Sequence, residues 1–266
     1  MLKTVSNGQS IHQYIPPHLR RIFYNNPAAI HASQNGKDSY GFPTEGLMLY
    51  LPLWALKGSG FKSTDAYRHS CAVTGAVWGS QGRTLDGDDY INPTYGATLY
   101  PTLATFMCWV KSTNDAGMVL AGWTDTTVDA TYQAVWIGDG VTGSLTNELI
   151  AMLRNPTNPY ILGYETATRT ELFDGAFHHV AVTFNGTTCS IYLDGASKTV
   201  TVGSGSNNGK FGGLAGVNEM NIGSWNRLTG RAGYLTGSIG DVWLYNRALS
   251  AVEIQHNRLA TMWRYQ

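Results

Sequence analysis

The sequence has little charge and no excess of either sign. Only 14% of its 266 residues are Asp, Glu, Lys or Arg, and 18 basic residues balance 18 acidic ones. An average soluble domain has roughly a quarter of its residues charged. A neutral chain lacks the basic surface that binding to DNA or RNA requires, so we expect no nucleic-acid partner.

Cysteine and long apolar runs are also scarce. The three cysteines, Cys71, Cys108 and Cys189, lie far apart, and no Cys-x-x-Cys spacing occurs, which argues against a zinc site or a disulfide framework. The most apolar stretch, residues 47–56, is far shorter than a membrane span and contains a proline, so we expect no membrane insertion. The first 21 residues show no apolar segment typical of a secretory signal, and we expect synthesis in the cytoplasm.

Aromatic residues, glycine and short apolar runs are what the sequence does have. Aromatics make up 12% of the chain, which contains 31 glycines. Short runs rich in β-branched and aromatic residues, separated by Gly, Asn or Asp, are typical of a β-sandwich. We expect strands at residues 47–53, 105–111, 117–123, 132–137, 148–154, 160–164, 178–184, 188–193, 198–202, 220–222 and 239–246.

Two local signals fix a turn and a helix. Asp194-Gly195 separates residues 188–193 from residues 196–202 and supplies the positive φ angles of a type I′ hairpin turn. Ser250 followed by Glu253 forms the pattern of a capping box. The second signal predicts a short helix over residues 251–257.

Residues 1–44 differ from the rest of the chain because they are polar, irregular and interrupted by prolines. We expect an N-terminal arm over 1–44 and one β domain over 45–266. Residues 17–24 form a short helical candidate with one apolar face. Either the chain's own domain or an oligomer or larger assembly holds this segment. Its docking residues are predicted to be Leu19, Arg20, Arg21, Ile22 and Phe23.

Four motifs follow one another in a characteristic order. They are Gly-Arg-Thr-Leu-Asp-Gly-Asp-Asp-Tyr-Ile at 82–91, Asp-Gly-Ala-Phe-His-His-Val-Ala-Val-Thr-Phe at 174–184, Ile-Tyr-Leu-Asp-Gly at 191–195, and Gly-Ser-Ile-Gly-Asp-Val-Trp-Leu-Tyr-Asn-Arg-Ala-Leu-Ser-Ala-Val-Glu-Ile at 237–254. This order resembles the laminin-G-like branch of the concanavalin A-like lectin/glucanase superfamily. The resemblance implies an all-β jelly roll of two antiparallel sheets, with sites on the concave face or on loops at its rim.

The last motif has a clear alternation. Val242 and Leu244 share one face of the predicted strand, and Asp241, Trp243 and Tyr245 share the other. The strand and the capped helix after it therefore have a mainly structural role.

Catalytic carboxylates are not evident. Glycoside hydrolases need two carboxyl groups that flank the scissile bond, and the glucanase branch carries them as Glu-x-Asp-x-x-Glu. None of the six glutamates here has a second carboxylate two residues away. We predict no catalytic residues and no enzyme activity, while a glycoside hydrolase with carboxylates from separate strands remains an alternative.

Calcium is the one cofactor that the resemblance implies. Members of the family often hold a structural calcium between an early loop and the closing strand, and Asp65 and Asp241 match those positions. Carboxylates on loops suit this hard cation. The alternative is that Asp65 caps a turn and that Asp241 accepts hydrogen bonds from backbone amides.

Sugar binding is the commonest non-enzymatic function of this family. It requires an aromatic platform with amide or carboxylate groups beside it. Core packing is the alternative role for each such aromatic ring. The candidates are Trp123, Asp125, Trp136, Asp139, Tyr160, Tyr164, Trp225 and Asn226.

We therefore expect a non-enzymatic, lectin-like module. The missing secretory signal and the arm favour a virion or extracellular particle, with the chain as a decoration, tail or fibre component that binds host glycans. Its expected partners are a glycan or cell-surface polysaccharide, and a second copy or other particle proteins bound through the arm. A secreted or cell-surface carbohydrate-binding protein is the alternative.

Overall fold

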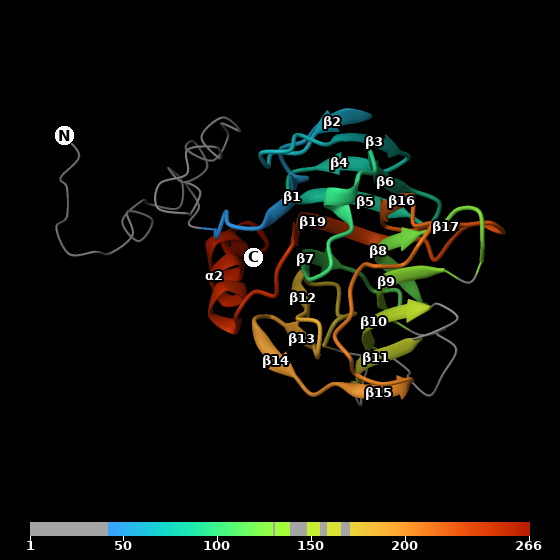
Figure 1. Cartoon of the computed structure of the whole chain (residues 1–266). Coiled ribbons are helices and arrows are strands. Elements are labelled where there is room, and N and C mark those ends of the chain that lie inside the picture. Colours follow the sequence, from blue (N-terminus) through green and yellow to red (C-terminus); the bar gives the residue numbers. More distant parts are fainter. Residues whose placement is uncertain (1–41, 130, 139–147, 155–158, 166–170) are drawn as a thin grey trace.

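The structure is a computed structural model that describes residues 42–129, 131–138, 148–154, 159–165 and 171–266. Two large antiparallel sheets pack face to face as a sandwich (Figure 1). This confirms the predicted all-β jelly-roll class.

The first sheet has eight strands, in the order β14-β13-β12-β7-β19-β5-β4, with β1 also paired to β19. Its strands are β1 (Leu47–Pro52), β4 (Val77–Gly79), β5 (Gly82–Asp86), β7 (Ala104–Lys111), β12 (His178–Phe184), β13 (Cys189–Leu193), β14 (Ala196–Lys198) and β19 (Thr236–Tyr245).

The second sheet has nine strands, in the order β15-β11-β10-β9-β8-β16-β6-β3-β2. Its strands are β2 (Gly60–Lys62), β3 (Ser70–Thr74), β6 (Tyr90–Pro93), β8 (Met118–Thr124), β9 (Tyr132–Ile137), β10 (Glu148–Arg154), β11 (Tyr160–Glu165), β15 (Thr201–Ser204) and β16 (Glu219–Ile222). A short 3-10 helix, η3 (Ala97–Leu99), precedes β7.

The main core lies between the two sheets, and the closing strand shows how alternation builds it. Val242 and Leu244 belong to this core. Trp243 and Tyr245 belong to a second cluster on the outer face of the eight-stranded sheet, as the alternation in the sequence predicts.

Helix α2 (Ala251–Thr261) and the 3-10 turn η4 (Met262–Arg264) cover that second cluster. In Figure 1, α2 lies on the opposite side of the molecule from β8–β11. Ser250 and Glu253 form the predicted capping box. The helix continues to Thr261, beyond the predicted end, because Ile254 and Thr261 are buried and tertiary packing extends it.

A small hairpin covers the outer face of the nine-stranded sheet. It consists of β17 (Trp225–Arg227) and β18 (Gly230–Ala232). Trp225 packs there with Val119, Tyr132 and Trp136. A Cβ on Gly122 of β8 would lie 2.8 Å from the Cβ of Trp225, so glycine is what allows the hairpin to lie so close to the sheet.

Most expected strands are present, and the predicted turn is confirmed. Asp194 and Gly195 have φ angles of 51° and 77°, and they connect β13 to β14. The single strand expected over 198–202 is wrong, because β14 ends at Lys198 and β15 begins at Thr201 in the other sheet. The short strands β2–β6 and the hairpin β17–β18 were not predicted.

Residues 1–41 lie outside the described residues, and so do all five residues of the predicted docking segment. Phe42, which the sequence assigns to the arm, is fully buried against Tyr50 and Trp243. Among the helices in the described ranges, none is long and apolar enough to cross a membrane.

Candidate functional site

A pocket of about 420 Å³ opens on the outer face of the nine-stranded sheet, beside the β17–β18 hairpin. Strands β3, β6 and β16 form its floor, and Arg231 of β18 closes one side. It is lined by Ala72, Thr74, Tyr90, Asn92, Thr94, Tyr95, Asn218, Glu219 and Arg231.

The alternation of two short strands places the polar side chains in this pocket. In β6, Ile91 points into the core while Tyr90 and Asn92 point outward. In β16, Met220 and Ile222 are core residues, and Glu219 lies on the outer face. The strand of β16 was expected from the sequence, at residues 220–222, but without Glu219. Strand β6 was missed, because four residues are too few to stand out by their periodicity.

Glu219 is the centre of the hydrogen-bond network. Its Oε1 accepts from the Asn221 amide at 2.8 Å and from the Arg231 guanidinium at 2.8 Å. Its Oε2 accepts from the Asn226 amide at 2.9 Å. The Asn92 amide donates to the Met220 carbonyl at 3.0 Å and lies 3.4 Å from Oε1. These donors hold the carboxylate in one orientation.

Arg231 joins the hairpin to the floor of the pocket. Its guanidinium carbon lies 3.7 Å from the centroid of the Tyr90 ring, a stacked cation–π geometry. An N–H group of Arg231 also donates to the Ser224 hydroxyl at 3.2 Å. The side chains of Arg231 and Glu219 retain 15% and 20% of their exposure, so a ligand in the pocket can reach both.

The electrostatics keep Glu219 ionised. Burial alone would raise the pKa of Glu219, but hydrogen bonds from Asn226, Asn221 and Arg231 outweigh burial and lower it. Among the described residues that line the pocket, Glu219 is the only carboxylate. A single ionised carboxylate suits the binding of hydroxyl groups. It does not supply the acid and base pair of glycoside hydrolysis.

Two of the predicted sugar-binding rings lie in the main core. Trp123 and Tyr160 are fully buried between the sheets. The Trp123 indole donates to the Leu99 carbonyl at 2.7 Å, and the Tyr160 hydroxyl donates to the Lys210 carbonyl at 2.6 Å. Neither ring offers a face to a sugar in this structure.

The other predicted residues are dispersed. Asp125 accepts from the Thr127 backbone, and Tyr164 donates to Glu171, so neither lines the pocket. Asp139 lies outside the described residues. Asn226 does belong to the Glu219 network.

Trp136 and Trp225 are packed against each other. Their ring centroids lie 5.0 Å apart, and that of Tyr132 lies 4.6 Å from Trp225. Only 6% and 7% of Trp136 and Trp225 are exposed. Trp225 therefore anchors the hairpin that carries Asn226 and Arg231, which places it next to the site without making it a platform.

The two aspartates predicted to hold calcium already have other partners. Asp65 accepts from the backbone amides of Tyr50, Tyr67 and Arg68. Three amide donors are what the turn-capping alternative predicts for Asp65, and they leave it poorly placed to ligate a cation.

Asp241 is buried and is surrounded by donors. Its Oδ2 pairs with the Arg264 guanidinium at 2.6 Å and accepts from the Tyr265 hydroxyl at 2.9 Å. Its Oδ1 accepts from the Tyr50 hydroxyl and the Trp54 indole, both at 3.1 Å. A guanidinium in the ligand position repels a cation, so these residues do not fit calcium.

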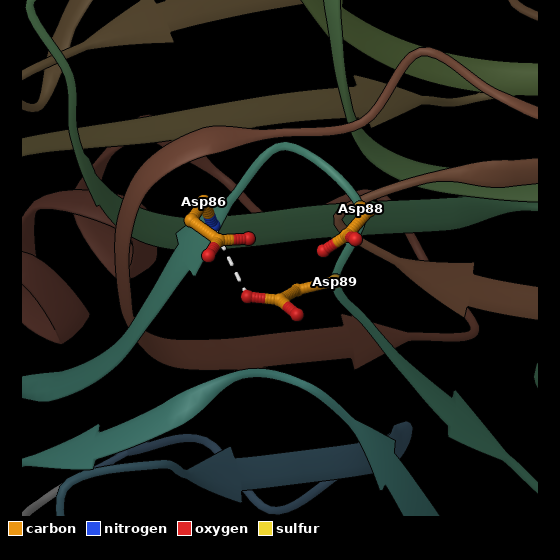
Figure 2. A group of neighbouring side chains, drawn as sticks. All are labelled: Asp86, Asp88 and Asp89. Atoms are coloured by element: carbon orange, nitrogen blue, oxygen red, sulfur yellow. Dashed lines mark hydrogen bonds between the residues drawn. The ribbon is translucent and has the colours of Figure 1, made fainter.

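A different acidic group lies in the turn between β5 and β6. Figure 2 shows Asp86, Asp88 and Asp89 with carboxylates directed toward one another, and one oxygen of each lies within 4.8 Å of the others. Asp89 is buried, and its Oδ2 accepts from the Asp86 backbone amide at 3.1 Å. This hydrogen bond stabilises the turn.

Comparison with solved structures identifies similar folds. The CBM40 of the Ruminococcus gnavus IT-sialidase, bound to alpha2,3 sialyllactose, has 15% identity and a TM-score of 0.54, over 70% of this chain and 97% of its own. The leech intramolecular trans-sialidase, complexed with 2,7-anhydro-Neu5Ac, has 19% identity and a TM-score of 0.57, over 81% of this chain and 28% of its own.

At these identities the likeness concerns the fold. No curated protein matches the chain in sequence. The family described as the concanavalin A-like lectin/glucanases superfamily matches residues 85–255. This range runs from β5 to α2 and includes strands of both sheets and the pocket residues of β6, β16 and β18, whereas β1–β4 precede it. The chain therefore belongs to the concanavalin A-like lectin/glucanases superfamily.

Proposed function

We propose that the chain is a non-catalytic glycan-binding module and that the pocket around Glu219 is its binding site. The observation that carries the proposal is one partly exposed, ionised carboxylate fixed by Asn221, Asn226 and Arg231. A carboxylate with amides beside it can exchange hydrogen bonds with several sugar hydroxyls. Tyr90 and Tyr95 add aromatic surface for the apolar side of a sugar ring.

The comparisons support the same class of ligand. The CBM40 structure with a similar fold holds a sialylated oligosaccharide, and the family description names lectins as well as glucanases. The single carboxylate in the pocket favours binding over hydrolysis.

The test is a glycan-array screen with the purified chain, followed by calorimetry on a glycan that binds. We expect Glu219→Gln to weaken binding about tenfold or more, because it removes a charged acceptor. Glu171→Gln is the matched control, since Glu171 pairs with Lys198 away from the pocket.

A second variant separates blocked binding from disturbed folding. Thr74 lines the pocket and is exposed, so Thr74→Trp fills the pocket while every residue of the Glu219 network keeps its identity. If the array is empty, or if both variants bind like the wild type, the proposed site is refuted. If reducing ends are released from a bound glycan at catalytic protein concentrations, the chain is a hydrolase instead.

We further propose that the module is the recognition domain of a virion or extracellular particle, anchored by residues 1–44. The arm's apolar positions Leu19, Ile22 and Phe23 support this role. Light scattering on the full chain tests it. Phe23→Asp should dissociate an oligomer that His18→Asp leaves intact, and a monomeric wild type would contradict a self-assembly role.

A further inference from the structure

The β17–β18 hairpin sends two arginines in opposite directions. Arg231 of β18 reaches Glu219 and Tyr90 on the pocket side. Arg227 of β17 lies over Trp225 and Tyr132, with its guanidinium carbon 4.8 Å and 5.5 Å from their ring centroids. Tyr132 is on β9, across β8 from the pocket strand β16. The hairpin thus divides the outer face of the sheet into two regions: the pocket side, and the other side around Tyr132.

A second arginine shares the Tyr132 ring. The guanidinium carbon of Arg154, on β10, lies 5.9 Å from the centroid of that ring, and Arg154 donates to the Tyr132 hydroxyl at 3.5 Å. Arg154 is exposed. Stacking uses the face of a guanidinium and leaves the N–H groups at its edge available to an oxyanion.

The charge on the two sides of the hairpin is different. On the pocket side, Glu219 neutralises Arg231 through a 2.8 Å ion pair. On the other side, no carboxylate of the described residues lies within 4.0 Å of Arg154 or Arg227. Asp129 lies within electrostatic reach of both arginines, and its Oδ1 accepts from the backbone amide and the hydroxyl of Thr229.

The charges of both arginines act on Asp129. Its pKa is lowered, first by the hydrogen bond from the Thr229 amide, and further by the charges of Arg227 and Arg154. Among the residues that the structure describes, two arginines against one aspartate give this side an excess of positive charge, in a chain whose net charge is zero. The Nε of Arg227 is also buried without a hydrogen-bond partner among the described residues.

We propose that Arg154 and Arg227 form a second subsite, which binds the carboxylate or sulfate group of an acidic glycan whose neutral part occupies the Glu219 pocket. This proposal rests on the proposed function and narrows its ligand class. Arginine suits this role because its planar donors match the oxygens of carboxylate and sulfate. A ligand that reaches both sides crosses the hairpin tip at Leu228, which is 63% exposed, so it is an oligosaccharide.

The test compares acidic glycans with their neutral counterparts on the full chain. The probes are 3′-sialyllactose against lactose, and sulfated against unsulfated N-acetyllactosamine, which separate carboxylate from sulfate as the recognised group. We expect at least one acidic probe to bind about tenfold more tightly than its neutral partner, and the difference to shrink between 50 and 500 mM NaCl.

Single and double variants then show which residues cause the preference for acidic probes. Arg154→Gln and Arg227→Gln should each reduce the acidic preference, and the double variant should abolish it while binding of the neutral probe is unchanged. Arg227→Lys keeps the positive charge and should therefore retain part of the preference that Arg227→Gln loses. Lys210→Gln removes one exposed charge elsewhere and should have no effect. Thermal unfolding of each variant verifies that the hairpin remains folded.

The outcomes separate the two proposals. If a neutral probe binds as tightly as its acidic partner, or if the preference survives in the double variant, the second subsite is refuted and the glycan-binding function stands. If a DNA oligonucleotide of similar charge competes as well as the acidic glycan, the site is a general anion patch and the subsite is likewise refuted. If no glycan binds, both proposals fail.

Discussion

His179 makes a specific prediction about stability in acid. Its side chain is fully buried beside Trp109 and Trp243, with ring centroids 5.3 Å and 6.0 Å away. Neither ring nitrogen has a hydrogen-bond partner among the described residues. Burial lowers the pKa of His179 to about 3, and Arg258 adds to the effect against the opposing charge of Asp194.

Proton linkage gives the direction and the size of the change in stability that His179 causes. In the unfolded chain the pKa of a histidine is about 6.5, so between pH 6.5 and pH 3 the unfolded state binds one more proton than the folded state. The effect of His179 on stability is therefore constant above pH 6.5, and it lowers the free energy of unfolding progressively as the pH decreases below 6.5. The loss amounts to about 3 kcal/mol at pH 4.5 and to about 5 kcal/mol at pH 3.

The variant that tests this is His179→Leu, which has a similar volume and does not titrate. We expect its free energy of unfolding at pH 7 to stay within about 1.5 kcal/mol of the wild type. Its decrease from pH 7 to pH 4.5 should be about 3 kcal/mol smaller. Urea unfolding at pH 4.5, 5.5 and 7, followed by tryptophan fluorescence, gives both values.

The neighbouring histidine provides the control. Hydrogen bonds from His178 to Asp194 and Asp174, at 2.8 Å and 3.0 Å, raise the pKa of His178 against its burial. Its contribution is fully present below pH 6.5 and is lost as the pH rises. His178→Gln should therefore change the pH dependence of stability above pH 6.5, while the loss of stability in acid remains. If His179→Leu shows the same acid loss as the wild type, the reasoning is refuted.

Three further predictions concern the hairpin, the buried ion pair and calcium. Trp225→Ala should cost about 3 kcal/mol in urea unfolding and weaken glycan binding as well, because the hairpin loses its anchor; lost binding at unchanged stability would instead make Trp225 a sugar platform. Arg264→Gln should destabilise the fold by about 3–5 kcal/mol, since it leaves Asp241 charged and buried, and adding Asp241→Asn should recover part of that loss. EDTA should not alter the melting temperature of the wild type, and a decrease that Asp241→Asn abolishes would restore the calcium hypothesis.

Periodicity and turn chemistry were sufficient for much of the fold. The alternation in β19 predicted which residues face the core, and Asp194-Gly195 predicted the hairpin turn, because both signals act over a few neighbouring residues. Strands β2–β6 escaped prediction since they have three to five residues each, too few for a period of two to be recognised.

The site depended on contacts that the sequence does not encode locally. Glu219 and Arg231 are 12 residues apart, and Tyr90 is more than 100 residues from either. Only the order of β6 beside β16, with the hairpin folded back over β8, brings them together. The tryptophans that the composition pointed to became core residues, because large apolar surfaces are buried first.

The sequence alone therefore determined the class of fold, the closing strand with its capped helix, and the family. Each depends on local pattern or on the order of motifs. The tertiary structure decided the partners: Asp241 faces Arg264 where calcium was expected, and Trp225 anchors the hairpin that carries Arg227 and Arg231. The physical reason is that burial and charge pairing depend on which distant segments meet, and in an antiparallel sandwich most neighbours are distant in sequence.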